Sequence, residues 1–176
     1  MAFHHIALAT RDLPATHRFY TEVMGFEVAK VVVAPTPSGK GWAKHAFYDT
    51  GGDGLLAFWE LHDETIPDFD PAISTAVGLP EWVNHLAFDS GLDDLPGRRD
   101  AWLEHGYDVV EVDHGFCVSI YAMDPNGVLV EWCADTRPLN ADDRAHAERV
   151  VLAEAPEWED PPMPTFYEAK SFVPAG

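Results

Sequence analysis

Basic residues are scarce in this sequence: 11 lysines and arginines stand against 30 aspartates and glutamates, giving a formal net charge of −19. Proteins that bind nucleic acid or anionic membranes contact phosphate groups through lysine and arginine. The charge therefore argues against both kinds of partner. There are only two cysteines, Cys117 and Cys133, in no paired motif. This usage indicates a reducing, cytoplasmic compartment rather than a disulfide framework.

Long apolar runs are also missing, so the sequence contains no segment that could span a bilayer. The N-terminus enters a strand within two residues, without a basic and then apolar signal segment, and we expect a cytoplasmic protein. Hydrophobic residues nevertheless make up 47% of the 176 residues. That fraction and length predict a globular chain of one domain, or of two small modules that share a core.

The first part of the chain is predicted to form a strand, a helix and three further strands. In Phe3–Ala9, the residues Ile6 and Leu8 share one face of the strand, and His5 shares the other with two alanines. An amphipathic helix over about 14–24 follows, capped by Asp12 and ended by Gly25. Strand-like runs at about 26–34, 42–49 and 55–61 follow, separated by turn-forming segments.

The same pattern then restarts. Residues 82–88 repeat the first strand, with His85 where a second copy of His5 should fall, 80 residues later. A helix over about 95–105 ends at Gly106, which lies 81 residues after Gly25, and three more strands run to Glu131. An internal repeat is a stronger organisational signal than any single propensity.

The repeat predicts an α+β fold of two βαβββ modules, residues 1–62 and 82–134, joined by a linker over residues 63–81. Because the apolar faces of the strands pack against the helices, His5 and His85 should lie on the opposite faces. Residues 135–176 should form a helix over about 142–153, capped by Asn140, and a proline-rich extended tail over 156–176.

One stretch near the end of the second module carries polar residues inside predicted strands. Residues 116–123 alternate and are rich in strand formers, residues 124–127 (Asp-Pro-Asn-Gly) are a turn, and Val128 starts the return strand. His114, Tyr121 and Glu131 occupy positions where apolar side chains would pack better. A carboxylate inside a strand needs a partner, and a metal ion is the favoured one if histidines converge on it.

This stretch resembles a known signature. The order is His114, five residues, an aliphatic residue, Tyr121, two residues, Asp-Pro-x-Gly, three residues, and Glu131. It is similar to the signature of the extradiol ring-cleaving dioxygenases of the vicinal-oxygen-chelate superfamily, which also contains glyoxalase I and bleomycin-resistance proteins. The broader resemblance covers roughly residues 3 to 134. It implies that the two modules form an open, cup-like mixed barrel.

Two imidazoles and one carboxylate, from His5, His85 and Glu131, would leave three positions of an octahedral metal open, as in non-haem iron oxygenases. The alternative is two satisfied core histidines and a surface glutamate. A repeat-related pair of histidines together with a signature glutamate favours the metal. The resemblance implies Fe(II), with Mn(II), Ni(II) and Zn(II) as alternatives.

Two further residues take their predicted roles from the resemblance. Tyr121 should lie one strand across from Glu131, on the same face unless a bulge intervenes. In the dioxygenases the matching tyrosine hydrogen-bonds the metal-bound substrate oxygen, and the residue that matches His114 lines the pocket. Otherwise the two are an ordinary buried aromatic side chain and a histidine at the end of a strand.

Glu60 could be a fourth ligand, as in glyoxalase-type sites. Aligning Tyr48 with Tyr121 puts Phe58 at the position of Glu131, which leaves Glu60 two residues further along, with the right parity. That alignment favours three metal ligands, with Glu60 as an outer or substrate-contacting group. A shift of two residues in the strand would instead make Glu60 the fourth ligand. The chain also departs from the dioxygenases, because Asp53-Gly54 stands where they carry an acid–base histidine. His45 and His62 are nearby candidates, but neither matches the position, so either another group handles the protons or the reaction is different.

The sequence thus predicts a metal-dependent enzyme that cleaves the ring of a catechol-type aromatic substrate with O2. One alternative is a metal-dependent lyase or isomerase of the glyoxalase or epimerase type, in which Glu60 or Glu131 moves a proton. Another is a metal-free protein that sequesters a small molecule. A homodimer is possible, because the linker is long enough for the modules to pair within one chain or between two.

Overall fold

The computed structural model describes residues 3–52, 54–156, 158 and 160–169. The chain divides into two compact units, Met1–Phe88 with Met123–Val130, and Asp89–Ala122 with Glu131–Gly176. The fold is of the α+β class, as the sequence predicts, with one four-stranded and one five-stranded sheet among the described residues. Each unit is described by itself below.

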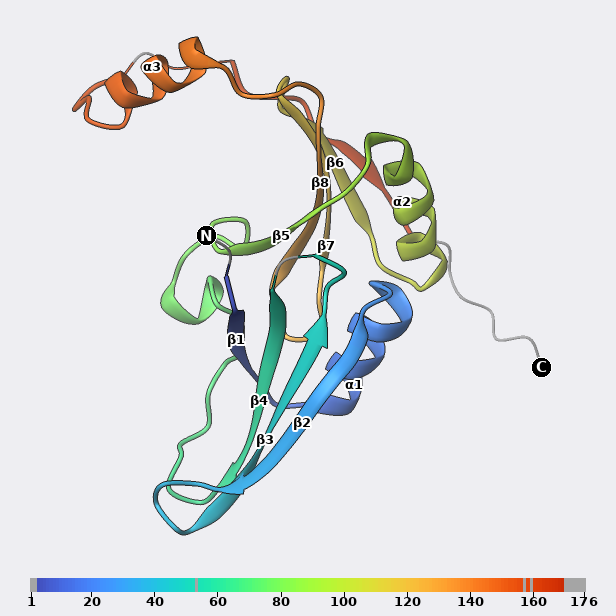
Figure 1. Ribbon diagram of the computed structural model, residues 1–176, viewed down its shortest axis with the longest axis vertical. Helices are drawn as coiled ribbons and strands as arrows, with labels where there is room; N and C mark the ends of the chain where they lie inside the picture. Colours follow the sequence, from blue (N-terminus) through green and yellow to red (C-terminus); the bar gives the residue numbers. More distant parts are fainter. Residues whose placement is uncertain (1–2, 53, 157, 159, 170–176) are drawn as a thin grey trace. The chain divides into compact units, whose positions relative to one another are not determined.

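The first sheet has the strand order β1-β4-β3-β2 (Figure 1). Its strands are β1 (His5–Thr10), β2 (Glu27–Pro35), β3 (Gly41–Asp49) and β4 (Leu55–Asp63). β1 is parallel to β4, whereas β2, β3 and β4 form an antiparallel meander. The register pairs odd-numbered residues of β1, β3 and β4 with one another. We call the face that carries these odd-numbered residues the histidine face, because it includes His5 and His45.

Helix α1 (Leu13–Arg18) covers the other face, which we call the α1 face, and continues as a π-helical segment, Phe19–Val23. The Asp12 side chain caps α1 by accepting a hydrogen bond of 2.8 Å from the Ala15 N–H. The helix ends at Gly25, whose φ of +77° is a conformation that glycine adopts without steric cost. The predicted cap and stop residues are therefore the ones that the structure uses.

The core of the first unit lies between α1 and the α1 face of the sheet. The Tyr20 ring lies 4.9 Å from Phe58 and 6.2 Å from Tyr48, and all three side chains are buried. Burial of aromatic side chains of this size supplies much of the hydrophobic stabilisation of a small domain. The helix and the sheet are thus fixed to each other by residues of even number in β3 and β4.

A turn from the second repeat belongs to this first unit. The buried carboxylate of Asp124 accepts hydrogen bonds from the Tyr20 hydroxyl (2.9 Å) and from the backbone N–H groups of Asn126 and Val128 (both 2.8 Å). The Asn126 carboxamide oxygen accepts a bond of 2.7 Å from the Thr10 hydroxyl. The Asp-Pro-Asn-Gly motif is therefore a structural anchor that ties the turn to β1 and α1.

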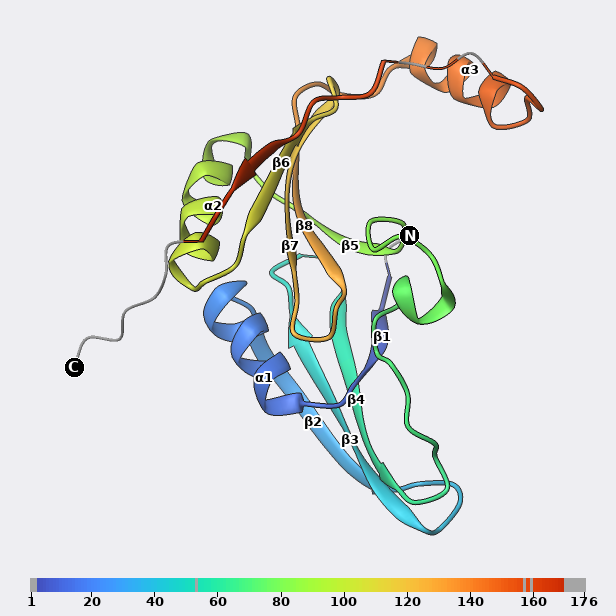
Figure 2. The same ribbon diagram turned by 180° about the vertical axis from the view of Figure 1, so that it is seen from behind.

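The second sheet has the order β5-β8-β7-β6-β9. Its elements are β5 (His85–Asp89), β6 (Val109–Asp113), β7 (Cys117–Met123), β8 (Leu129–Asp135) and β9 (Thr165–Tyr167), with helix α2 (Leu95–Glu104) before β6. The sequence predicts α2 and the strands of the repeat, but not β9. This short strand pairs antiparallel with β6 (Figure 2), so part of the proline-rich extended tail forms an edge strand of the sheet.

Helix α2 packs on one face of this sheet through Trp102, which is fully buried, and Arg98. The Arg98 guanidinium lies 3.6 Å from the centre of the Trp132 ring, a close cation–π contact. Trp132 therefore points toward α2. Because side chains alternate along a strand, its neighbours Glu131 and Cys133 lie on the opposite face, which we call the Glu131 face.

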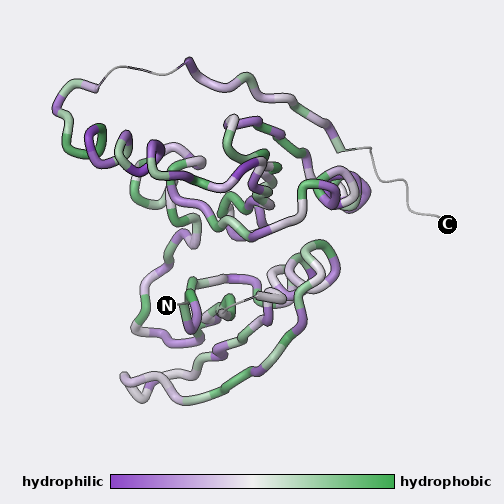
Figure 3. The backbone as a smooth tube through the Cα atoms, turned by 45° about the horizontal axis from the view of Figure 1, so that its top comes forward, coloured by the Kyte–Doolittle hydropathy of each residue, from purple (hydrophilic) through white to green (hydrophobic). Residues whose placement is uncertain are grey.

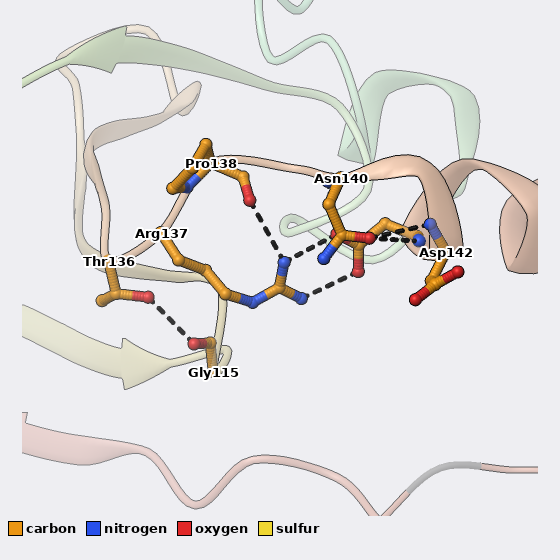
Figure 4. Close-up of polar contacts among 7 residues, drawn as sticks. Gly115, Thr136, Arg137, Pro138, Asn140 and Asp142 are labelled. Carbon is orange, nitrogen blue, oxygen red and sulfur yellow. Dashed lines mark hydrogen bonds and ion pairs between the residues drawn. The ribbon is translucent and has the colours of Figure 1, made fainter.

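Helix α3 (Ala141–Val150) follows β8, with hydrophilic and hydrophobic residues alternating along it (Figure 3). Asn140 and Asp143 form a capping box, as the sequence predicts for the cap. The Arg137 guanidinium clamps the start of the helix with two hydrogen bonds to Asp143, 2.6 and 2.8 Å long (Figure 4). Among the described residues, no helix combines the length and apolar character that a membrane crossing requires.

Candidate metal and substrate site

The histidine face of the first sheet brings four aromatic side chains together. The His45 imidazole stacks on the Trp59 indole, with ring centres 3.8 Å apart, and Phe47 lies 4.1 Å from His45. The exposed His5 ring lies 6.0 Å from His45 and 5.5 Å from Phe47. The predicted metal ligand His5 thus lies beside a second histidine in an aromatic setting.

His45 is the unusual member of this group, because its side chain is only 8% exposed. Within the part of the chain that the structure describes, its buried Nε2 atom has no hydrogen-bond partner. Burial lowers the pKa of His45, and the neighbouring His5 lowers it further. A buried polar atom without a partner is costly, so this nitrogen marks a point where a bound molecule could supply a hydrogen bond.

His85 lies at the start of β5, as the repeat predicts, and is exposed. Its Nδ1 atom lies 3.2 Å from the carbonyl oxygen of Trp82. Because a carbonyl can only accept, the proton of the neutral imidazole sits on Nδ1 and the lone pair on Nε2. This is the usual arrangement of histidines that ligate metals.

The β7–β8 hairpin positions the remaining predicted residues. At its two ends the Asp124 N–H donates to the Val128 carbonyl and the Thr136 N–H donates to the Phe116 carbonyl, both at 2.9 Å. Both bonds belong to the same antiparallel register, so no net bulge intervenes. That register places Tyr121 directly opposite Glu131, as the sequence predicts, and hence on the Glu131 face.

Tyr121 connects two other predicted residues. Its hydroxyl oxygen lies 3.0 Å from Nε2 of His114. Burial raises the pKa of Tyr121 to about 12; Ser119 lowers it, and the charge and hydrogen bonding of Glu131 raise it. The phenol is therefore protonated at neutral pH and can donate a hydrogen bond. Glu131 itself is 5% exposed, so its carboxylate is buried beside a tyrosine hydroxyl.

The three predicted metal ligands fall in different units: His5 and His85 belong to the first, and Glu131 belongs to the second. Among the described residues, no group of three or more histidine, cysteine, aspartate or glutamate side chains is close enough together to hold an ion. The ligand set therefore stays a prediction.

Glu60 lies on the face of β4 opposite to the one that the sequence predicts. Its carboxylate accepts hydrogen bonds from Lys44 Nζ (2.8 Å) and from the Leu13 N–H at the start of α1 (3.4 Å), so it lies on the α1 face, away from His5. The carboxylate also lies 3.1 Å from Nε2 of His62, within hydrogen-bonding distance. Burial raises the pKa of Glu60, but the hydrogen bonds outweigh this effect and the pKa lies below its ordinary value.

The misplacement comes from aligning the two hairpins one residue out of step. Tyr48 faces α1, whereas Tyr121 faces away from α2, so these tyrosines are not equivalent. Asp49 pairs with Leu55 across a five-residue loop, and the register of β7 and β8 gives a loop of the same length. Superposing the loops puts Ala57, rather than Phe58, at the position of Glu131.

The two candidates for the missing acid–base histidine lie on opposite faces of the first sheet. His45 lies on the histidine face beside His5, whereas His62 lies on the α1 face, where its ring stacks on Trp42 with centres 3.9 Å apart. Asp53 lies outside the described residues. Only His45, of these two, shares a face with a predicted ligand.

Sequence reasoning missed the surroundings of Glu131. Ser119 and the two cysteines lie on the same face as Glu131, because their numbers have the same parity in the β7–β8 register. Burial raises the pKa of the Cys117 thiol, and the neighbouring Cys133 thiol raises it further. The signal for this grouping was the alternation of β7, which the sequence already showed.

Comparison with known proteins agrees with the fold and the signature. The sequence profile of the Glyoxalase/Bleomycin resistance protein/Dioxygenase superfamily matches residues 2–132, more than half of the chain. The chain belongs to this superfamily. Members of the superfamily commonly use divalent metal ions. No curated protein matches the sequence.

Solved structures of superfamily type resemble the chain at low identity. The fosfomycin resistance protein FosX of Listeria monocytogenes is 19% identical, with a TM-score of 0.54 over 80% of this chain and 94% of FosX. The antibiotic-binding protein TnmS3 of Streptomyces sp. CB03234 is 17% identical, with a TM-score of 0.51 over 77% and 97% of the two chains. The oxidase ChaP-H2 is 18% identical, with a TM-score of 0.53 over 80% of this chain and 96% of ChaP-H2. At these identities the likeness shows the fold.

Proposed function

We propose that this superfamily member is a metal-dependent enzyme that acts on a small molecule with two adjacent oxygens, by extradiol-type ring cleavage of a catechol-like substrate. The observation that carries the proposal is the group on the Glu131 face. A buried carboxylate lies opposite a protonated tyrosine, whose hydroxyl is within hydrogen-bonding distance of His114. Such a group is costly in a structural core and suits a site that binds an ion and an oxygen-rich substrate.

The chemistry of the donor set fits a divalent cation of the iron type. His5, His85 and Glu131 would hold it, and two imidazoles with one carboxylate are typical of non-haem Fe(II) enzymes. The hydrogen bond between His85 Nδ1 and the Trp82 carbonyl orients the imidazole for ligation through Nε2. When bound, such an ion polarises the substrate oxygens as a Lewis acid.

Other side chains of the protein position the substrate and stabilise its charge. Tyr121 donates a hydrogen bond to a substrate oxygen and stabilises negative charge there, because its phenol keeps its proton at neutral pH. His114 holds the Tyr121 hydroxyl in position. On the first sheet, the His45 ring lies 6.0 Å from the ring of the predicted ligand His5, and its buried Nε2 has no hydrogen-bond partner among the described residues.

A glyoxalase-like reaction is less well supported, because it calls for a second glutamate. Glu60 is engaged with Lys44, His62 and the start of α1 on the other face. A metal-free binding protein remains the second candidate. The observation that favours it is an apolar groove on the histidine face, described below, which would hold a ligand without an ion.

One experiment separates the three functions. The protein is loaded anaerobically with Fe(II), then exposed to air with a panel of catechols, while absorbance and O2 are recorded. The proposal predicts a yellow ring-fission product with matching O2 uptake. Activity with Ni(II), Co(II) or Zn(II) and no O2 uptake would show a lyase or isomerase. Failure to retain metal, together with ligand binding, would show a binding protein.

A further inference from the structure

A groove of about 550 Å³ opens on the first unit, at the end of the sheet where β2 turns into β3. It is lined by Ala34, Ala43, Trp59 and Leu61, by residues 35–38, and by Asp63, Thr65 and Ile66. Ala34 pairs with Ala43 and Ala43 with Leu61 in the strand register, so these side chains share the histidine face. The groove therefore lies on the same face of the sheet as His5 and His45.

The hollow has a local cause in the sequence. Two small residues, Ala34 and Ala43, lie opposite each other on neighbouring strands, where larger side chains would fill the surface. On one side the Trp59 indole, 37% exposed, forms a flat wall. On the other, Pro35 and Pro37 border the groove and stiffen the β2–β3 turn, because proline fixes its own backbone angle. The shape is thus set before any ligand binds.

Polar groups at the rim of the groove form hydrogen bonds with one another. The Asp63 carboxylate accepts hydrogen bonds from the hydroxyls of Thr36 and Ser38, and from the Thr65 hydroxyl (2.6 Å) and N–H (2.8 Å). These bonds, led by the one from Ser38, hold the pKa of Asp63 below its usual range. The groove therefore has an apolar floor and a fixed negative charge at its rim, which disfavours anionic ligands.

Trp59 links this groove to the predicted ligand residue. One face of its indole stacks on His45, and the His45 ring in turn lies 6.0 Å from His5. A molecule with one end beside His5 would therefore pass over His45 and Trp59 before it entered the groove. The groove alone, with a volume of about 550 Å³, is larger than a single six-membered ring would occupy.

We propose that the groove binds the neutral, apolar ring body of a polycyclic small molecule, whose oxygen-bearing end lies beside His5. The volume is in the range of small-molecule pockets, roughly 300–1,000 Å³, which are lined mainly by apolar and aromatic side chains. The position of the oxygen-bearing end rests on the proposed function. Binding of the ring body does not, because it needs no metal.

The test uses prodan, a neutral naphthalene dye whose emission shifts to the blue in apolar surroundings, titrated into the full chain with a chelator present. We expect saturable binding at one site per chain. Trp59→Ala should weaken it about tenfold, the equivalent of roughly 1.4 kcal/mol lost from aromatic contact, whereas Trp59→Phe should keep most of it. Leu61→Glu should abolish it by placing a second charge in the groove.

Trp42→Ala is the matched control. Trp42 lies at the same end of the sheet, is 42% exposed and also stacks on a histidine, but on the α1 face. It should change prodan affinity by no more than about twofold, within the scatter of single contacts. Circular dichroism and thermal melting establish that each variant is folded.

Equal affinity of the Trp59→Ala and Trp42→Ala variants, or the absence of saturable binding, would overturn the proposal. Sedimentation experiments give a further test. If dye binding is lost whenever a dimer dissociates, the dye occupies an interface between two copies, and the proposal is wrong. Since the chelator removes any ion, a failed metal site leaves this result unchanged. The reverse also holds: metal uptake does not require the groove.

Discussion

The two repeats build the same hairpin and put different chemistry on it. In the register of the strands, His45, Phe47, Ala57 and Trp59 of the first hairpin correspond to Ser119, Tyr121, Glu131 and Cys133 of the second. The first set is mainly aromatic and apolar, and the second is polar with a buried carboxylate. The two hairpins thus share their register and each has a helix-covered face, whereas the side chains on their other faces differ.

The strands that begin each repeat kept their histidines, whereas only the second hairpin carries a carboxylate at the equivalent position. Ala57 takes that position in the first. The proposed donor set is therefore asymmetric, with two imidazoles and one carboxylate, which favours one three-ligand site over the four-ligand site of glyoxalase type. In this proposal the aromatic face of the first repeat is available to the substrate.

The largest expected effect separates the two glutamates. Glu131→Gln should lower Fe(II) affinity at least about a hundredfold and reduce ring cleavage to background, because it removes a charged ligand and keeps the shape. Glu60→Gln is the control and should keep metal affinity within about threefold, well under the tenfold or more that loss of an outer hydrogen-bond partner costs. Anaerobic titration calorimetry measures both. Loss of metal from Glu60→Gln alone would reverse the comparison.

The turns of the two hairpins differ in burial, and their aspartates should differ accordingly. Asp124→Ala removes the buried acceptor for the Tyr20 hydroxyl and for the Asn126 and Val128 N–H groups. We expect a loss of about 2–4 kcal/mol in the free energy of unfolding. Asp49→Ala, at an exposed turn, should cost about 0.5 kcal/mol or less. Urea denaturation compares them, and equal losses would contradict the anchoring role of the second turn.

The two tyrosines should differ in catalysis. Tyr121→Phe should lower kcat by roughly thirty- to a hundredfold without loss of metal, as expected when one donor to a developing negative charge is removed. Tyr48→Phe, which changes a buried residue on the α1 face, should leave kcat nearly unchanged. Steady-state kinetics on the Fe(II)-loaded protein decides this. An unchanged kcat in Tyr121→Phe would remove this tyrosine from the reaction.

The smallest expected effect is on stability at alkaline pH, and a tyrosine in each repeat should contribute to it. Burial raises the pKa of Tyr48 to about 12, and Tyr121 reaches a similar value with burial as the main cause. The unfolded chain loses these protons near pH 10, so both residues stabilise the fold below pH 10, and this stabilisation is lost between about pH 10 and 12. Each Tyr→Phe variant should flatten this alkaline decline by on the order of 1 kcal/mol. Denaturation at pH 9 and 11.5 measures it.

Periodicity and repeat spacing predicted most of the fold and the faces of the key strands. Asp12, Gly25 and Asn140 cap or end helices as expected, and Tyr121 lies opposite Glu131. Glu60 was misplaced, because a sequence alignment one residue out of step moves a side chain to the other face of a strand. Strand β9 was missed, since three residues in a proline-rich tail show no periodicity. The stacking of His45 on Trp59 depends on strand pairing that sequence alone does not provide.

We propose that the paired histidines of the repeat and the single glutamate hold one ion. The most direct test is the metal content of the native chain and of His85→Ala, both reconstituted anaerobically with Fe(II) and freed of excess ion. We expect about one ion per native chain and almost none in the variant, because a two-ligand site binds weakly. Full metal uptake by His85→Ala would contradict it.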